Sequence, residues 1–374
     1  MKRSLIIFSV VTVFGAAGAE ARQLPGGLSK GLGIAKKAND VRELQFTDAE
    51  EQELGKQVSD KIRTRYGVVQ DPAVHRYVSL VGLAMAQGST RTALPWTFIV
   101  LDTDGANAFA APGGYVHVTK GLLALIKNEA ELAGVLAHEI IHITEKHTIR
   151  AIQKSEAVKM ASADRAGLLQ LAVNATYENI VDRGFGRADE NEADEKGAAI
   201  ANKTGYAPNG LVTFLTTLKE RNKASTEKRG LFASHPEMQE RLDRITKQIA
   251  SQKLMATATL QPRYAKNISF KVVDPTAIAT VEAGAAGLTG GGAKAAEKKP
   301  EEKKAEEPKK GRFGLSRMLP TGGGESKQAQ VTASGGARGV DPEKDSRGGP
   351  NPAIVAVKIA AADVAAFRKE GGLP

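Results

Sequence analysis

Apolar residues recur at intervals of three and four along several stretches of the chain, the spacing that places them on one face of a helix. Thr47 followed by Glu50 has the spacing of a capping box, so the first helix is expected to begin there. The pattern predicts helices over residues 47–66 and 71–88, several helical segments from 122 to about 181, and further helices over 189–203, 207–222 and 234–250.

Two short segments have the character of strands. They are WTFIVLD at residues 96–102 and GGYVHVTKG at residues 113–121, the second of which follows a glycine-rich turn. Both lie between predicted helices. The order of elements therefore predicts a small sheet with helices packed on it, which is a mostly helical α+β fold.

The first residues have the pattern of a secretory signal. Lys2 and Arg3 precede an apolar run that ends near Phe14, and small residues suitable for cleavage follow. The run is shorter than the about 20 residues that span a bilayer, which favours cleavage over an uncleaved anchor helix. We predict a signal peptide at residues 1–21, a loose lead-in at 22–45, and a mature chain in the periplasm.

The composition changes beyond the predicted helical domain, which we place at residues 46–255. Residues 256–289 contain the apolar segment ISFKVV and are expected to form a short extension with a strand. Residues 290–350 are rich in lysine, glutamate and glycine, which predicts a disordered, low-complexity linker. Residues 351–374 read as a short terminal strand and helix.

The chain of 374 residues carries a formal net charge of +10, but acidic residues lie everywhere among the basic ones. Aromatic residues make up only 5% and do not alternate with basic residues, which argues against nucleic-acid binding. The charge is compatible with solubility and with peripheral contact with an anionic membrane surface. Because the chain has no cysteine, any metal must be bound by histidine and carboxylate side chains.

The sequence HEIIH at residues 138–142 has the spacing of a zinc site. His138 and His142 are four residues apart, so on a helix their imidazoles share one face. One Zn²⁺ per chain, about 2.0–2.1 Å from each nitrogen, can bridge them. Glu139 would then lie beside the metal, where it can act as the general base that takes a proton from water.

An ordinary core helix rich in histidine is the alternative. The flanking residues are apolar, so the helix is expected to be buried, and burying two histidines and a glutamate is costly unless something pairs them. We therefore favour the metal site. His147 lies nine residues beyond His138 and would point away from it on a continuous helix. The metzincin pattern is excluded, because Glu145 and Thr148 stand where it needs glycine and histidine.

An acidic segment near residue 190 offers the third metal ligand. Glu190 and Asp194 are four residues apart and would share one helical face. Glu190 can bind zinc, while Asp194 can accept the second N–H of a ligand histidine and so fix its tautomer. Spacing alone leaves open Glu192 or Glu195 as the ligand, and also an ordinary solvated acidic face.

Four motifs occur in order along the chain: NAFAAPGG at 107–114, HEIIH with the additional His147, ENEAD at 190–194 followed by GYAP, and HPEMQER at 235–241. Together they resemble the HtpX/Ste24-type zinc metallopeptidases (gluzincins), and in particular their soluble, periplasmic BepA- and LoiP-like members. The resemblance covers roughly residues 46–250 and implies a zincin-type metallopeptidase domain.

The resemblance also implies roles for individual residues. Glu190 becomes the third zinc ligand, and Asp194 the outer partner of a ligand histidine. The strand after the paired glycines becomes the edge that binds an extended peptide by strand addition, through Gly113, Gly114 and Tyr115. For Gly113 an ordinary turn is the alternative.

Two further residues come from the last motif. His235 is expected to approach the metal, where it either stabilises the oxyanion as a catalytic residue or occupies the open position as a latch. Arg241 either joins it there or only bonds the backbone. The long segment at 151–186 is expected to cover the cleft.

These implications predict a zinc metalloendopeptidase that hydrolyses peptide bonds in unfolded or misassembled envelope proteins, as part of protein quality control. Its expected partners are polypeptide substrates and outer-membrane assembly proteins. The main alternative is a latched, chaperone-like binding module in outer-membrane protein assembly with little proteolysis. An inert zinc-stabilised scaffold is less favoured, because a scaffold needs no general base such as Glu139.

Overall fold

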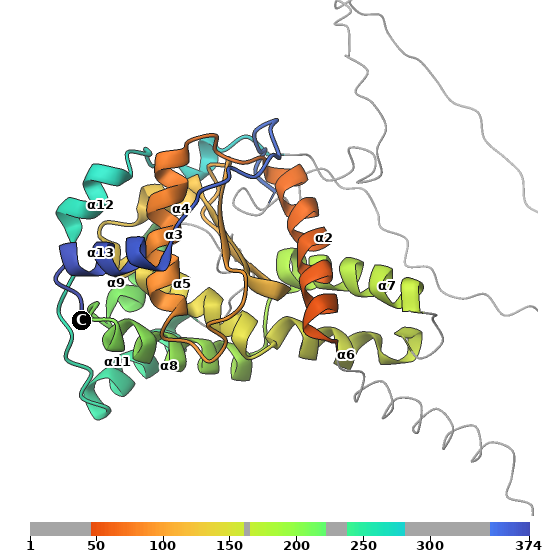
Figure 1. Ribbon diagram of the computed structural model, residues 1–374, viewed down its shortest axis with the longest axis horizontal. Coiled ribbons are helices and arrows are strands. Elements are labelled where there is room, and N and C mark those ends of the chain that lie inside the picture. Colours follow the sequence, from red (N-terminus) through yellow and green to blue (C-terminus); the bar gives the residue numbers. More distant parts are fainter. Residues whose placement is uncertain (1–45, 161–164, 222–237, 281–344) are drawn as a thin grey trace, which may run out of the picture.

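The computed structural model describes residues 46–160, 165–221, 238–280 and 345–374 (Figure 1). Helices predominate and the sheet is small, which confirms the α+β class. The predicted signal peptide, the lead-in and nearly all of the predicted linker lie outside the described residues. In chain order the elements are α2 (Asp48–Tyr66), α3 (Pro72–Ala86), β1 (Thr97–Leu101), β2 (Ala108–Ala111), η1 (Pro112–Gly114), β3 (Tyr115–Thr119), α4 (Lys120–Leu125), α5 (Glu129–Thr144), α6 (His147–Met160), α7 (Arg165–Glu178), η2 (Asn179–Arg183), α8 (Arg187–Lys203), α9 (Gly210–Arg221), α11 (Met238–Ser251), α12 (Gln261–Asn267), η3 (Pro275–Ala277) and α13 (Ala361–Glu370).

The sheet has three strands in the order β1-β3-β2. β1 runs parallel to β3, with Phe98 opposite Val116, and β2 runs antiparallel to β3, with Ala110 opposite Val116. The two predicted strands correspond to β1 and β3. β2 was not predicted, because its four residues Ala-Phe-Ala-Ala are too few and too uniformly apolar to show alternation.

The two faces of the sheet bury different side chains, as the two-residue period of a strand requires. Phe98 and Val118 face a core shared with α3 and α5, whereas Ile99 and Phe109 face a second core formed with α2 and α7. The sheet therefore lies between α2 on one side and α3 on the other (Figure 1). Both helices begin at side-chain caps, α2 at the predicted capping box of Thr47.

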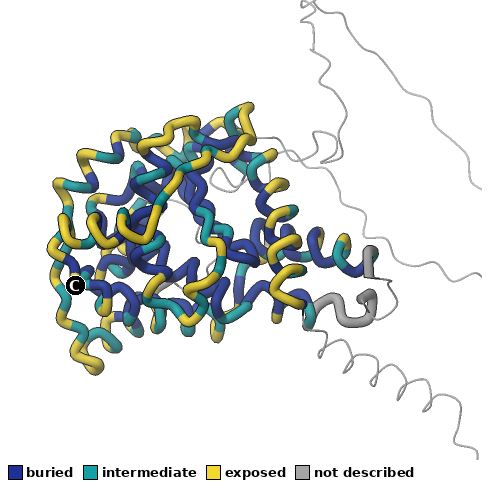
Figure 2. The backbone as a smooth tube through the Cα atoms, viewed as in Figure 1, coloured by how far each residue is buried: buried dark blue, intermediate teal, exposed yellow. Residues whose placement is uncertain are grey.

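Helix α5 is the centre of the molecule, and every one of its residues is buried. It packs against α3, α8 and α9, and it lies close to β2. Figure 2 shows buried residues gathered in the interior while exposed residues lie on the outer helices. Polar side chains on α5 are therefore held in an environment from which water is largely excluded.

The end of the chain is part of the packed structure. α13 lies against α3 (Figure 1), and its Phe367 is buried beside Tyr77 with ring centroids 6.2 Å apart. The guanidinium of Arg263 lies 3.9 Å from the centroid of the Phe367 ring and bonds Glu129 at the start of α5. The terminal segment thus packs on α3 and is linked through Arg263 to the start of α5.

Two strand predictions near the end of the chain are wrong. Residues 268–273, the segment ISFKVV, and residues 351–360 are not assigned to strands. Both lie along the surface of the domain, and Asn351 and Pro352 use backbone carbonyl groups to accept hydrogen bonds from Val68 and Arg63. Within residues 351–374, the predicted terminal helix is present as α13. Among the described residues, no helix combines the length and the apolar character needed to cross a membrane.

Candidate metal centre

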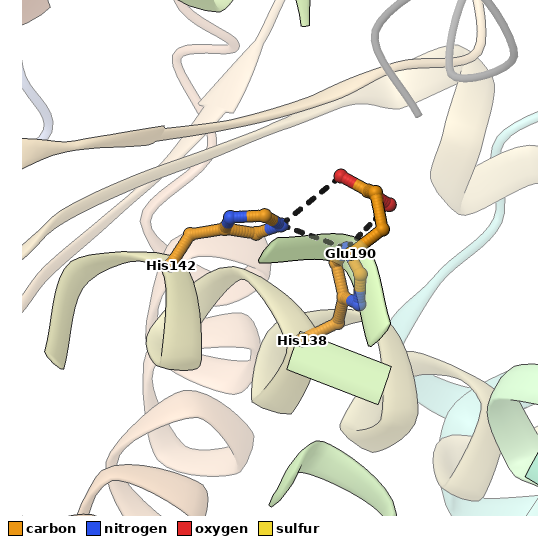
Figure 3. A group of neighbouring side chains, drawn as sticks. All are labelled: His138, His142 and Glu190. Carbon is orange, nitrogen blue, oxygen red and sulfur yellow. Dashed lines mark hydrogen bonds and ion pairs between the residues drawn. The ribbon is translucent and has the colours of Figure 1, made fainter. Parts of the chain in front are cut away.

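Three side chains that could bind a metal converge on one point (Figure 3). His138 and His142 project from α5 with their Nε2 atoms 3.0 Å apart. Glu190 reaches them from α8, with its carboxylate oxygens 3.6 Å from Nε2 of His138 and 3.5 Å from Nε2 of His142. All three residues are buried. Among the residues described, this is the only group of histidine and carboxylate side chains arranged to hold a metal ion.

The spacing of these donor atoms fits zinc. Ligand atoms about 2.0–2.2 Å from one tetrahedral ion lie about 3.3 Å from each other. The three observed separations, 3.0, 3.5 and 3.6 Å, bracket that value. Two imidazoles and one carboxylate are also a donor set that catalytic zinc sites use.

The packing of α8 on α5 brings Glu190 to the histidines. Gly197 lies where the two helices meet, and a Cβ atom there would come 3.2 Å from the backbone nitrogen of His138. A larger residue would therefore push the helices apart. Glu190 lies two turns before Gly197 on the same helix, so this close approach sets the distance between Glu190 and the imidazoles.

The structure places Asp194 beside the far side of the His138 ring. Its Oδ1 lies 3.0 Å from His138 Nδ1, so it can accept the hydrogen on that nitrogen and leave Nε2 facing the metal position. Burial raises the pKa of Asp194, but the charge and hydrogen bonds of Arg241, together with His138, outweigh burial and hold that pKa at about 2.

Arg241 contacts the acidic side chains that lie around the metal position. His235, the residue that Arg241 was expected to join, lies outside the described residues. Its guanidinium donates to both oxygens of Asp194, at 2.9 and 2.7 Å, and lies 3.0 Å from Glu190. Arg241 thus neutralises two buried carboxylates and holds them in place.

Glu192 and Glu195, the alternative ligands, do not join the cluster. Glu192 contacts His147, Arg150 and Lys196, and Glu195 is exposed. Glu139 is buried on α5 directly after His138 and adds to the negative charge around Arg241.

Phe185 covers one face of the His142 ring and was not singled out in the sequence. The two rings are stacked, with centroids 3.8 Å apart and planes 21° from parallel. Phe185 lies between η2 and α8, at the end of the segment 151–186 that was expected to cover the cleft. A single aromatic residue in a loop gives no sequence signal for such a contact.

Strand addition at Tyr115 is not compatible with the sheet. β3 is the central strand, and Tyr115 has Thr97 on one side and Ala111 on the other, so a peptide cannot pair with it. Gly113 and Gly114 are buried in a turn with φ of 74° and 100°, a backbone conformation that favours glycine. Their position supports the alternative of an ordinary turn. The outer strand on the α5 side is β2.

Glu51 connects that turn to the end of α5. It is 1% exposed and lies 2.7 Å from Arg91 and 3.0 Å from Lys146, the second residue after α5. Its carboxylate also accepts the backbone N–H of Gly113 at 3.2 Å. Burial raises the pKa of Glu51, but Arg91 and Lys146 outweigh burial, so this pKa lies below its ordinary value.

Replacing Glu51 by glutamine is expected to lower the free energy of unfolding by about 1–3 kcal/mol at pH 7. A depressed pKa stabilises the fold above the unfolded value of about 4.3, and this contribution is lost as the pH falls through the folded value. The difference between parent and variant should therefore shrink below about pH 4. Urea unfolding with a chelator throughout measures it, with the exposed Glu53→Gln on the same helix as control. A difference independent of pH would contradict this account of Glu51.

Comparison with known proteins agrees with the motifs. The model of peptidase family M48 matches residues 72–249, which contain the histidine pair, Glu190 and Arg241. Residues 72–249 are thus similar to a peptidase family M48 domain. The resemblance drawn from the four ordered motifs is thereby confirmed, and a metalloprotease family implies a bound metal at this cluster.

Three relatives from Escherichia coli (strain K12) show how far the similarity extends. The beta-barrel assembly-enhancing protease is 26% identical over 208 residues, which are 52% of this chain and 42% of the relative. The metalloprotease YcaL is 26% identical over 270 residues, 68% of this chain and 100% of the relative. The metalloprotease LoiP is 27% identical over 252 residues, 64% of this chain and 94% of the relative. The chain spans less than half the length of the beta-barrel assembly-enhancing proteases it matches.

Proposed function

We propose that this protein is a zinc-dependent endopeptidase of the cell envelope that hydrolyses peptide bonds in unfolded or misassembled envelope proteins. The convergence of two imidazoles from α5 and one carboxylate from α8, with Glu139 beside them, carries the proposal. His138, His142 and Glu190 would hold one zinc ion per chain. When bound, zinc supplies a Lewis acid that polarises a carbonyl group and makes a water molecule more acidic.

The protein's own groups account for the rest of the chemistry. Glu139 would accept a proton from the attacking water at its carboxylate and later deliver it to the leaving amine. Asp194 and Arg241 keep His138 oriented, since they form a continuous chain of contacts behind it. The burial of the cluster excludes bulk water and strengthens each of these electrostatic interactions. His235 remains a candidate for stabilising the oxyanion or for closing the site.

The names of the relatives support a role in the envelope. Several are called beta-barrel assembly-enhancing protease, and two others are called metalloproteases. We accordingly propose polypeptide substrates, outer-membrane assembly proteins as partners, and a periplasmic location after removal of the signal peptide.

One observation favours a second candidate function, a latched, chaperone-like module with little proteolysis. Phe185 stacks directly on His142, so the segment that leads into α8 covers part of the site. This segment therefore restricts the access of an extended peptide to the His142 ring. In this second reading the domain binds unfolded envelope proteins and cuts them rarely.

Removing the metal is expected to abolish proteolysis. The mature chain, from residue 22, should degrade casein, lose that activity in excess chelator, and regain it when zinc is returned. Dialysis should leave about one zinc per chain, as measured by atomic emission. Proteolysis that continued unchanged in chelator, with no zinc in the purified protein, would refute the endopeptidase proposal.

A further inference from the structure

His147 contacts a metal-binding residue although it does not face the metal position. A continuous helix would point it away from His138, but α5 ends at Thr144 and α6 begins at His147. Between them Lys146 has a φ of 56°, which turns the chain sharply. The turn brings His147 Nδ1 to 2.8 Å from His142 Nδ1, on the side of the His142 ring opposite Nε2.

The other nitrogen of His147 has a fixed partner. Its Nε2 lies 3.1 Å from a carboxylate oxygen of Glu192 on α8. Glu192 is itself paired with Lys196 at 2.7 Å and with Arg150 at 3.3 Å. His147 is fully buried, whereas Glu192, Lys196 and Arg150 reach the surface. A row of contacts therefore runs from the metal cluster to the surface of the domain. It leads from His142 through His147 to Glu192, which is paired with Lys196 and Arg150.

Only one arrangement of hydrogens satisfies this row while His142 binds a metal. A neutral His142 that presents its Nε2 lone pair carries its hydrogen on Nδ1. That hydrogen must be donated to His147 Nδ1, which then has a lone pair and no hydrogen. His147 consequently carries its own hydrogen on Nε2 and donates it to the carboxylate of Glu192.

We propose that His147 is a positioning residue that fixes the tautomer and ring orientation of His142, and that Glu192 anchors it from α8. The two ligand histidines are thus oriented by different partners. The charged carboxylate of Asp194 accepts the Nδ1 hydrogen of His138, whereas the neutral imidazole of His147, which itself donates to the carboxylate of Glu192, accepts the Nδ1 hydrogen of His142. Outer partners of this kind commonly contribute 10- to 100-fold to metal affinity. The inference rests on the metal site of the proposed function.

Zinc affinity, measured by competition with a fluorescent chelator, tests the inference without using proteolysis. His147→Leu fills the space but cannot accept the hydrogen of His142, so its Kd for zinc should rise about 10- to 100-fold. His147→Asn places an acceptor near the Nδ1 position and should stay within about threefold of the parent. Equal affinity in His147→Leu and the parent would overturn the proposal, and so would an equal loss in both variants.

Glu192 provides a second test that does not alter the core. Glu192→Ala should weaken zinc binding in the parent but have no further effect in His147→Leu, because the row is already broken there. Glu195→Ala, an exposed change of the same charge on the same helix, should leave zinc affinity unchanged. If His147→Leu does not fold, the comparison of Glu192→Ala with Glu195→Ala decides alone, and equal affinities would overturn the proposal. A parent chain that does not bind zinc would refute the proposed function itself, whereas a zinc-binding parent with unaffected variants would refute only the role of His147.

Discussion

Replacing Glu139 by glutamine is expected to lower kcat/KM for peptide hydrolysis by about 10²- to 10⁴-fold, the contribution typical of a general base. Glutamine has the same shape but cannot accept the proton of the attacking water. Because Glu139 is not one of the three clustered ligands, the variant should retain its zinc. Cleavage of casein and zinc content, measured on the same preparation, check both parts of this prediction.

A matched control lies at the end of the same helix. Glu145 caps α5 and pairs with Lys196, seven residues from His138, so Glu145→Gln should retain activity within about twofold. Parental activity in Glu139→Gln would contradict the assigned role of Glu139.

The Glu139→Gln variant also separates the two candidate functions. If cells that carry Glu139→Gln in place of the parent keep an intact envelope, the binding module is favoured, and if they do not, the protease is.

Replacing Arg241 by methionine is expected to have the largest effect on stability. Arg241 is 2% exposed and lies between Asp194 and Glu190, which are 0% and 1% exposed. Removing it takes the nearest cation from two buried carboxylates and leaves Asp194 with the more distant Arg244 guanidinium at 3.5 Å, which should cost about 3–5 kcal/mol in the free energy of unfolding. Urea unfolding in chelator, so that zinc does not replace the lost charge, measures this cost.

The pH dependence of the free energy of unfolding should also have the opposite sign in Arg241→Met. In the parent, Asp194 has a pKa of about 2 and stabilises the fold at every pH above its unfolded value of about 3.9. Without Arg241, burial raises the folded pKa above the unfolded value, so the variant should lose stability as the pH rises from 4 to 7. Arg244→Met, on the same helix but 31% exposed, should cost less than about 1 kcal/mol. A loss of similar size in both variants would contradict the account of Arg241.

Much of the site could be predicted because helical spacing is regular. The four-residue intervals in 138–142 and 190–194 place each pair on one face, and the ordered motifs resolved which acid faces the histidines. The structure brings together the same three residues, His138, His142 and Glu190, and places Asp194 behind His138. The helical fold and two of the three strands could likewise be predicted from the spacing of apolar residues along the chain.

What could not be predicted depends on chain reversals and on contacts between distant segments. Nothing at Lys146 marks a break in the helix, since no glycine, proline or asparagine stands there, so His147 was expected to point away. Whether Tyr115 lies on an inner or an outer strand depends on β2, which is too short to detect. The contact of Phe185 with His142 and the packing of α13 on α3 join elements far apart in the chain. Only tertiary packing decides these features.

The position of the metal tests the central claim most directly. Crystals of the mature chain grown with zinc should give, in an anomalous difference map collected at the zinc absorption edge, one strong peak. We predict that the peak lies between Nε2 of His138, Nε2 of His142 and the carboxylate of Glu190, at about 2.0–2.2 Å from each. A zinc-containing crystal with no peak at that point would contradict the assignment of these three residues as a metal site.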